Sequence, residues 1–262
     1  MSYLEWYEDQ EAKAPVYPRP MPREEARKIK ERDKTFKTAL KSQAKGTGWR
    51  HADGSIFKQE GEWFLSVLPS MSYKSGVTVR WQCKPMAIDP LFWEIFHLEE
   101  NKKMPLSFRD RGAWTVRPSW PSRYIAFEET SPDKLAEAVL EWSNERRNAV
   151  SGFSVEKMLN RLGPLDELTA WKTEAICLLI LLARLDDAER LCLESDPTDC
   201  GGFSARRNNG GDRFYDYALE WIGRKQGRLP QEVKSDETVV SKTRSVQTGS
   251  HLTNILRSIF KK

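Results

Sequence analysis

Residues 76–85, with the sequence GVTVRWQCKP, alternate between apolar and polar side chains. Because side chains along a strand point to opposite faces in turn, Val77, Val79, Trp81 and Cys83 share one face. The polar residues between them share the other face. The pattern predicts a strand that places one face in a core and ends at the proline that closes the stretch.

The segments around this strand extend the β region. Residues 55–61 and 62–70 read as a hairpin that turns at Glu60–Gly61, and residues 113–120 and 122–129 predict two further short strands. A helix is predicted before the sheet over residues 22–45, starting at Pro22. Another is predicted over residues 89–100, with Asp89 as the N-cap and Pro90 at its first position.

Helical periodicity dominates from Ser131 onward. It predicts helices over residues 131–150, 154–162, 167–185, 186–194 and 213–227, with a polar loop at 196–212. We therefore expect an α+β fold, in which an N-terminal helix and an antiparallel sheet are followed by a C-terminal helical block. The expected parts are an extended arm (1–21), a sheet domain (22–130), a helical block packed on it (131–227), and a polar linker with an amphipathic basic helix (228–262).

Composition and charge narrow the class of protein. No stretch approaches the roughly 18 apolar residues of a membrane span, and the start lacks the basic-then-apolar order of a secretory leader. The four cysteines form no CxxC pair, which predicts reduced thiols in a cytoplasmic protein. The last helix at 251–262 could dock on the protein itself, on a partner or on a membrane surface.

Charge is segregated along the chain. Residues 131–200 hold 8 basic and 14 acidic groups, whereas residues 201–262 hold 12 basic and 6 acidic groups. Such an asymmetry can guide a charged partner, and it can equally be two solvated faces that partly neutralise each other.

Gln82 and Lys84 raise a catalytic hypothesis. Some metal-dependent nucleases place a carboxylate on one strand, and a glutamine and a lysine two residues apart at the end of the next. Asp53, Glu60 or Glu62 could supply that carboxylate, and Glu62 is the one included in the candidate set. The alternative is that Gln82 and Lys84 are the solvent face of a strand. The three histidines are far apart, and no phosphate-binding loop or nucleophile elbow is present, so we predict no metal and no cofactor.

Residues 108–123 interleave arginines with tryptophans. Arginine offers planar contacts to phosphate or carboxylate, and tryptophan stacks on rings and bases. The segment could grip single-stranded nucleic acid, form a protein interface, or be a strand with buried tryptophans and paired arginines. The candidate binding residues are Arg109, Arg111, Trp114, Arg117 and Trp120.

Residues 33–125 also resemble a family. The features are Trp49 after a glycine, Phe57 before a turn, and Gly76 leading the alternating strand, all after a short helix at 33–43. They are similar to bacterial domains of unknown function that include candidate immunity proteins of toxin systems. The resemblance implies an α+β fold and a non-catalytic binding role, and it identifies no catalytic residue.

The leading expectation is therefore a non-catalytic protein-binding module of the immunity or bacterial-defence type. Its interface would use the arginine–tryptophan segment or the acidic residues Asp186, Asp187 and Glu189. The alternatives are a metal-dependent nuclease that uses Glu62, Gln82 and Lys84, and a nucleic-acid-binding protein without chemistry.

Overall fold

The structure is a computed structural model of the 262-residue chain. It describes residues 22–71, 76–112, 114–118, 122–126, 131–150, 152–165, 168, 171–196, 204–205 and 212–228. The predicted fold class is confirmed: an N-terminal helix and an antiparallel sheet are followed by a helical block. These elements belong to one compact unit that ends at Gly223.

The sheet is an antiparallel meander. Its strands lie side by side in chain order: β1 (Arg50–Ala52), β2 (Ser55–Glu60), β3 (Trp63–Met71), β4 (Gly76–Pro85) and β5 (Ser122–Ala126). The expected hairpin is β2 and β3, whose turn lies at residues 61–62, one position later than predicted. Opposite Cα atoms pair Ser66 with Gln82 and Phe64 with Lys84, which puts those four side chains on one face.

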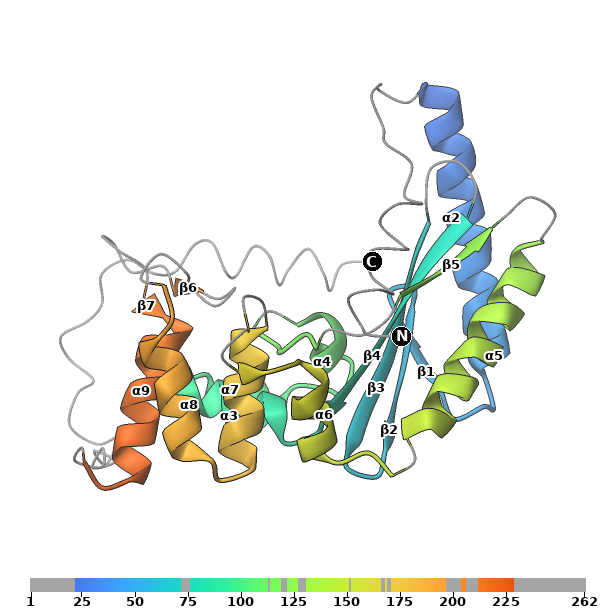
Figure 1. Cartoon of the computed structure of the whole chain (residues 1–262). Helices are drawn as coiled ribbons and strands as arrows, with labels where there is room; N and C mark the ends of the chain where they lie inside the picture. The colour runs from blue at the N-terminus through green and yellow to red at the C-terminus, as the bar shows by residue number, and fades with distance from the viewer. Residues whose placement is uncertain are drawn as a thin grey trace. The chain divides into compact units, whose positions relative to one another are not determined.

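The other face of the sheet forms the first core, as the alternation in β4 predicted. The four apolar side chains of that strand, which are Val77, Val79, Trp81 and Cys83, are at most 1% exposed. Helices α2 (Arg23–Ala44) and α5 (Pro132–Val150) cover this face, and Figure 1 shows both of them on the same side of the strands. Burial of each large apolar side chain stabilises the fold by about 1.5–3 kcal/mol.

Helix α5 begins where the sequence indicated. The Ser131 hydroxyl oxygen accepts a hydrogen bond from the backbone N–H of Lys134, which satisfies one of the unpaired donors of the first turn. Leu135, Val139 and Trp142 then face the sheet core. The boundary predicted between the sheet domain and the helical block lies at residue 130, but α5, which follows it, packs on the sheet together with α2.

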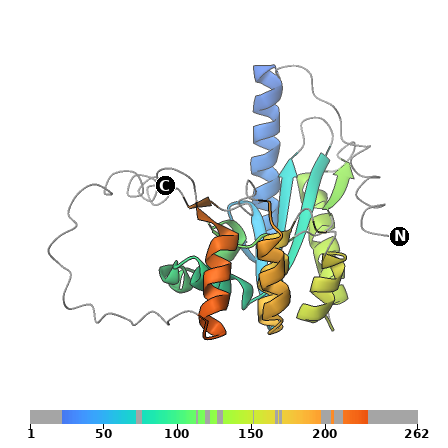
Figure 2. The same cartoon turned by 60° about the vertical axis from the view of Figure 1, so that its left-hand side comes forward.

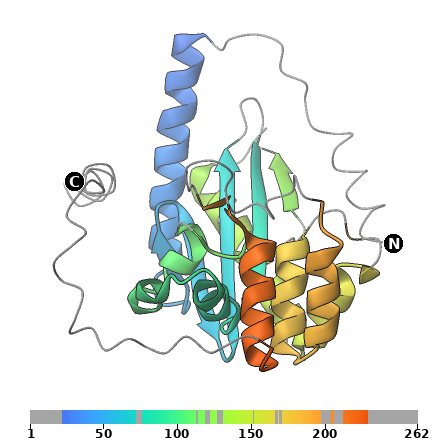
Figure 3. The same cartoon turned by 90° about the vertical axis from the view of Figure 1, so that its left-hand side faces the viewer.

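The second core lies among helices. It gathers α3 (Ile88–Ile95), α6 (Val155–Arg161), α7 (Lys172–Leu181), α8 (Leu185–Leu193) and α9 (Phe214–Lys225). Helix α7 is buried along its whole apolar run, and it lies against α8 and α3. Figure 3 shows α7, α8 and α9 running alongside one another in front of the sheet. Short elements complete the described chain: η1 (Glu99–Lys103), α4 (Phe108–Arg111), β6 (Ser204–Ala205) and β7 (Asp212–Arg213).

Three predicted elements differ from the structure. The helix expected at 167–185 is shorter and spans Lys172–Leu181, because Trp171 and Ala183 on either side adopt positive φ values of 66° and 58°. The helix expected at 89–100 begins at Ile88 and ends at Ile95, because His97 adopts a positive φ of 56° and breaks it. Asp89 is not its N-cap, since its carboxylate is turned into the protein. The strand expected at 113–120 is not formed over residues 114–118, where the backbone N–H and C=O of Val116 bond to side chains instead of a strand.

Several expectations fall outside the described residues. They are the arm at 1–21 and the linker and basic helix at 228–262, apart from Arg228. Across the described ranges, no helix combines the length and the apolar character that crossing a membrane requires.

Candidate functional site

Lys84 lies in a buried ionic cluster. Its side chain is 2% exposed and that of Asp89 is fully buried. The Nζ atom donates to Asp89 Oδ1 at 2.9 Å, and to the backbone oxygens of Arg109 and Val116 at 2.8 Å each. An ammonium group has three protons, so these three acceptors use all of them.

Asp89 is equally well satisfied. Its carboxylate also accepts from Arg109 Nη1 at 3.2 Å and from the backbone N–H of Val116 at 3.1 Å. Burial lowers the pKa of Lys84, and the neighbouring Asp89 charge opposes that shift. The cluster ties the end of β4 to α3, to α4 and to the chain at residue 116.

This geometry gives Lys84 a structural role. Gln82 is half-buried and accepts a hydrogen bond from Ser66 Oγ at 3.3 Å, while Glu62 is exposed in the β2–β3 turn. Because all three protons of the Lys84 ammonium group are donated to protein acceptors, none is left to hydrogen-bond to an attacking water. Among the residues that the structure describes, no three His, Cys, Asp or Glu side chains gather as metal ligands do. The nuclease role of Glu62, Gln82 and Lys84 stays a prediction.

The arginine–tryptophan segment is partly interior. Arg109 is 14% exposed and lies 5.5 Å from the centre of the Trp93 ring. Trp114 packs against Phe96 with 5.4 Å between ring centres and an angle of 54° between the ring planes. Arg117 is exposed. The Arg111 side chain and Trp120 lie outside the described residues. A partner-binding role for the segment stays a prediction, and its exposed arginines among the described residues are Arg117 and Arg123.

The acidic candidates lie on α8. Asp187 accepts from Arg184 Nε at 2.8 Å and from Arg190 Nη2 at 3.4 Å, and these bonds lower the pKa of its carboxyl. Asp186 is exposed and Glu189 is half-buried. The charge of Asp187 is thus already balanced within its own helix turn.

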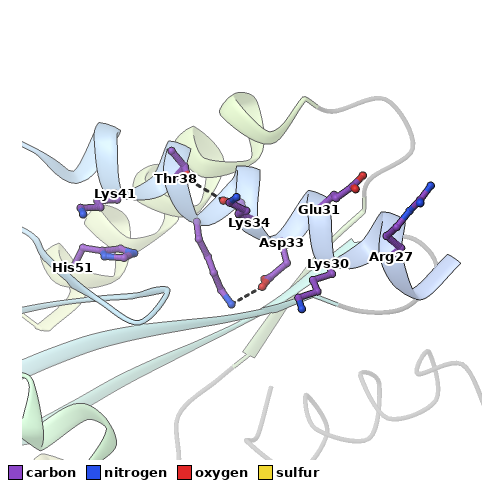
Figure 4. Close-up of a pocket in the computed structure, with 9 residues that line it drawn as sticks. Arg27, Lys30, Glu31, Asp33, Lys34, Thr38, Lys41 and His51 are labelled. Carbon is purple, nitrogen blue, oxygen red and sulfur yellow. Dashed lines mark hydrogen bonds and ion pairs between the residues drawn. The ribbon is translucent and has the colours of Figure 1, made fainter. Parts of the chain in front are cut away.

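A groove along α2 is lined by more cationic than anionic side chains. It encloses about 620 Å³, and Figure 4 shows its side chains following the helix from Arg27 to Lys41, where His51 of β1 adds to the wall. Seven of the nine described lining residues are charged, although the surface that they turn to the groove is chiefly that of their apolar stems: Arg27, Lys30, Glu31, Asp33, Lys34, Lys37, Thr38, Lys41 and His51. Five cations face two carboxylates, which leaves the groove positive.

The cations of the groove form one stripe. Successive members are three or four residues apart, from Arg27 through Lys30, Lys34 and Lys37 to Lys41. Because each residue advances an α-helix by about 100°, the five fall within about 80° of its circumference. The stripe lies to one side of the buried residues Phe36 and Leu40 that anchor α2 to the sheet.

Most of the stripe is uncompensated. Lys37 pairs with Asp33 at 2.5 Å, and its methylene groups lie where a Cβ on Gly54 would be. In the described part of the chain, Arg27, Lys30, Lys34 and Lys41 have no carboxylate at ion-pair distance, and all four are exposed. Four like charges on one helix face repel one another, a cost that an anionic ligand would remove.

The helix carries this stripe away from the body of the sheet. None of the residues from Arg23 to Thr35 is buried, and burial starts at Phe36. Figures 1 and 2 both show the N-terminal turns of α2 extending past the ends of the strands. The site is therefore accessible to a large ligand.

The sequence analysis missed this site, although a signal was present. The apolar positions of residues 22–45 were used to predict the helix, whereas the periodicity of its basic residues was not considered. Comparison with protein-family models, with characterised proteins and with solved structures gives no match. The resemblance to immunity-type domains therefore stays an expectation, and the argument for function rests on the groove.

Proposed function

We propose that the protein is a non-catalytic nucleic-acid-binding module, and that the groove of α2 is its binding site. The observation that carries the proposal is a row of four cations on one exposed helix face, Arg27, Lys30, Lys34 and Lys41, which no described carboxylate compensates. Phosphate contacts from lysine and arginine supply most of the affinity of non-specific nucleic-acid binding. A row of evenly spaced cations suits a polyanion better than a single small anion.

The local charge supports this reading more than the net charge does. The whole chain carries only +4, whereas α2 alone holds eight basic and four acidic side chains. The field of such an element steers an anionic polymer toward it over roughly a Debye length, about 8–10 Å at physiological salt.

The test compares two variants of equal charge. The groove variant replaces Arg27, Lys30, Lys34 and Lys41 by glutamine. The control variant replaces four exposed cations outside the groove by glutamine: Lys28, Arg32, Lys45 and Lys103. Glutamine and lysine have similar helix propensities, so α2 should stay folded in both, which circular dichroism checks.

Binding to a fluorescent nucleic acid is then measured by anisotropy over a series of salt concentrations. We expect the groove variant to bind at least about tenfold more weakly at low salt. The slope of log K against log salt concentration should decrease by roughly the amount that four phosphate contacts contribute. The control variant should keep most of the affinity and most of the salt dependence. Equal losses in the two variants, or no binding by the unmodified protein at low salt, would refute the proposal.

An acidic protein is the competing kind of ligand. Polyglutamate of matched charge is therefore included as a competitor. If it displaces the nucleic acid at equal charge concentration, the groove accepts carboxylates as readily as phosphates. That result would favour the protein-binding module expected from the sequence.

A further inference from the structure

We infer that the ligand of this groove is a DNA duplex, recognised through its phosphates without reading of bases. The inference rests on the proposed function and names the form of nucleic acid that the site accepts. Three properties of the groove carry it: the chemistry of its walls, its straightness, and the freedom of the helix that bears it.

The walls lack a stacking platform. Proteins that hold single strands combine a positive groove with aromatic side chains on which successive bases stack, and each stacked base contributes about 1–3 kcal/mol. Of the nine described residues that line the groove, none is Phe, Tyr or Trp. His51 is the only ring among them, and it is half-buried at one end. A single ring cannot stack a run of bases, so a single strand would gain little beyond charge.

The stripe is straight and rigid. From Arg27 to Lys41 it spans about 21 Å, since an α-helix rises 1.5 Å per residue. A duplex presents a rigid row of phosphates over such a length. A single strand must instead be ordered to match the cations, and that ordering costs conformational entropy without stacking to offset it. A rigid row of charge therefore favours the partner that is already rigid.

The helix can be approached closely. The turns from Arg23 to Thr35 bury no side chain, and an α-helix with side chains is about 10–12 Å wide. The major groove of B-form DNA, about 12 Å wide, admits an element of that size. Its lysines and its arginine can contact phosphates along both walls of that groove, and phosphate contacts position a duplex without specifying sequence. No Asn or Gln, the residues that pair with adenine edges, is among the described lining residues.

The experiment measures anisotropy with four probes: two DNA duplexes of unrelated sequence and about two helical turns each, an RNA duplex, and oligothymidine of the same length. We expect both DNA duplexes to bind about tenfold more tightly than oligothymidine at equal salt, and more tightly than the RNA duplex, whose major groove is narrow. The two DNA duplexes should agree within about threefold, since phosphate contacts carry no sequence information. Comparison of the DNA and RNA duplexes distinguishes the two sources of duplex.

Two variants sharpen the result. The groove variant should lose the preference for the duplex as well as the affinity. His51→Ala should change duplex affinity less than about twofold, because stacking is not used. Oligothymidine binding as tightly as the duplexes, or a strong loss in His51→Ala, would overturn this inference and leave the proposed function standing. Failure of every probe to bind would instead overturn the proposed function.

Discussion

At the scale of residues, the buried pair of Lys84 and Asp89 determines how the two halves of the fold meet. The end of β4 would otherwise be an ordinary strand end. The ammonium group instead bonds to the carboxylate of α3 and to two backbone carbonyls, at Arg109 and Val116. Desolvation of these charges is costly, and it is offset here because Lys84 and Asp89 each make three hydrogen bonds and the Arg109 side chain makes two.

Lys84→Met tests this role. The substitution leaves Asp89 with one fewer cation and two buried carbonyls without a donor, so we expect a loss of roughly 3–5 kcal/mol in the free energy of unfolding. Urea denaturation at neutral pH measures it. Arg80→Met is the matched control, since Arg80 is exposed on the same face of β4, and it should cost less than about 0.5 kcal/mol.

A double variant separates charge from packing. Adding Asp89→Leu to Lys84→Met removes the unpaired carboxylate and should recover part of the lost stability, because the two side chains are in contact. Our account is wrong if Lys84→Met is no more harmful than Arg80→Met.

At the scale of elements, a polar link joins the first hairpin to α5. Glu60 at the end of β2 accepts from Arg147 of α5 at 2.9 Å and pairs with Lys58 at 2.7 Å. The hydrogen bond from Arg147, followed by that from Lys58, lowers the pKa of the Glu60 carboxyl. The link therefore connects the end of β2 to helix α5.

This link predicts a pH dependence. A carboxyl whose pKa is lower in the folded state stabilises the protein above its unfolded pKa, and that stability is lost as pH falls through the folded value. Because Glu60 is partly exposed and screened by solvent, we expect Glu60→Gln to cost only about 0.5–1 kcal/mol at neutral pH. The difference should shrink as the pH falls below the ordinary pKa of a glutamate, and it should disappear below the lowered pKa of the folded protein, as measured by urea denaturation across pH. A difference that persists in acid would contradict the assignment.

At the scale of the whole molecule, both cores enclose thiols. Cys83 lies in the sheet core, and Cys177 and Cys192 lie in the helical core. Burial raises the pKa of all three thiols, that of Cys192 to about 12. Since the thiolate is the reactive form, these cysteines are protected from reaction in two ways: reagents cannot reach them, and their raised pKa keeps them protonated.

Thiol labelling should therefore report global unfolding. In a Cys200→Ser variant, which removes the one cysteine outside the described residues, we expect no reaction with a disulfide reagent in the native state at mildly alkaline pH. All three thiols should react in denaturant, with a midpoint that coincides with that of tryptophan fluorescence. Rapid labelling of one thiol in the native protein would show that its core opens locally.

The sequence by itself determined the elements that depend on local pattern. The alternation of Val77 to Cys83 specified β4 and its buried face, and the cap at Ser131 specified the start of α5. Local pattern also contained the basic stripe of α2, although apolar periodicity alone did not identify it. Such features are predictable because periods of two and of about 3.6 residues follow from backbone geometry.

Only the tertiary structure decided which polar groups meet. The local sequence around Asp89 is compatible both with a helix cap and with a buried acceptor for Lys84. The local sequence around Val116 is likewise compatible both with a strand and with the irregular chain that bonds to Asp89. Likewise, the value of Arg27, Lys30, Lys34 and Lys41 as a site depends on the absence of carboxylates beside them in the described fold and on the exposure of their helix. Pairing and exposure are properties of long-range packing, which brings residues together independently of their separation in the chain.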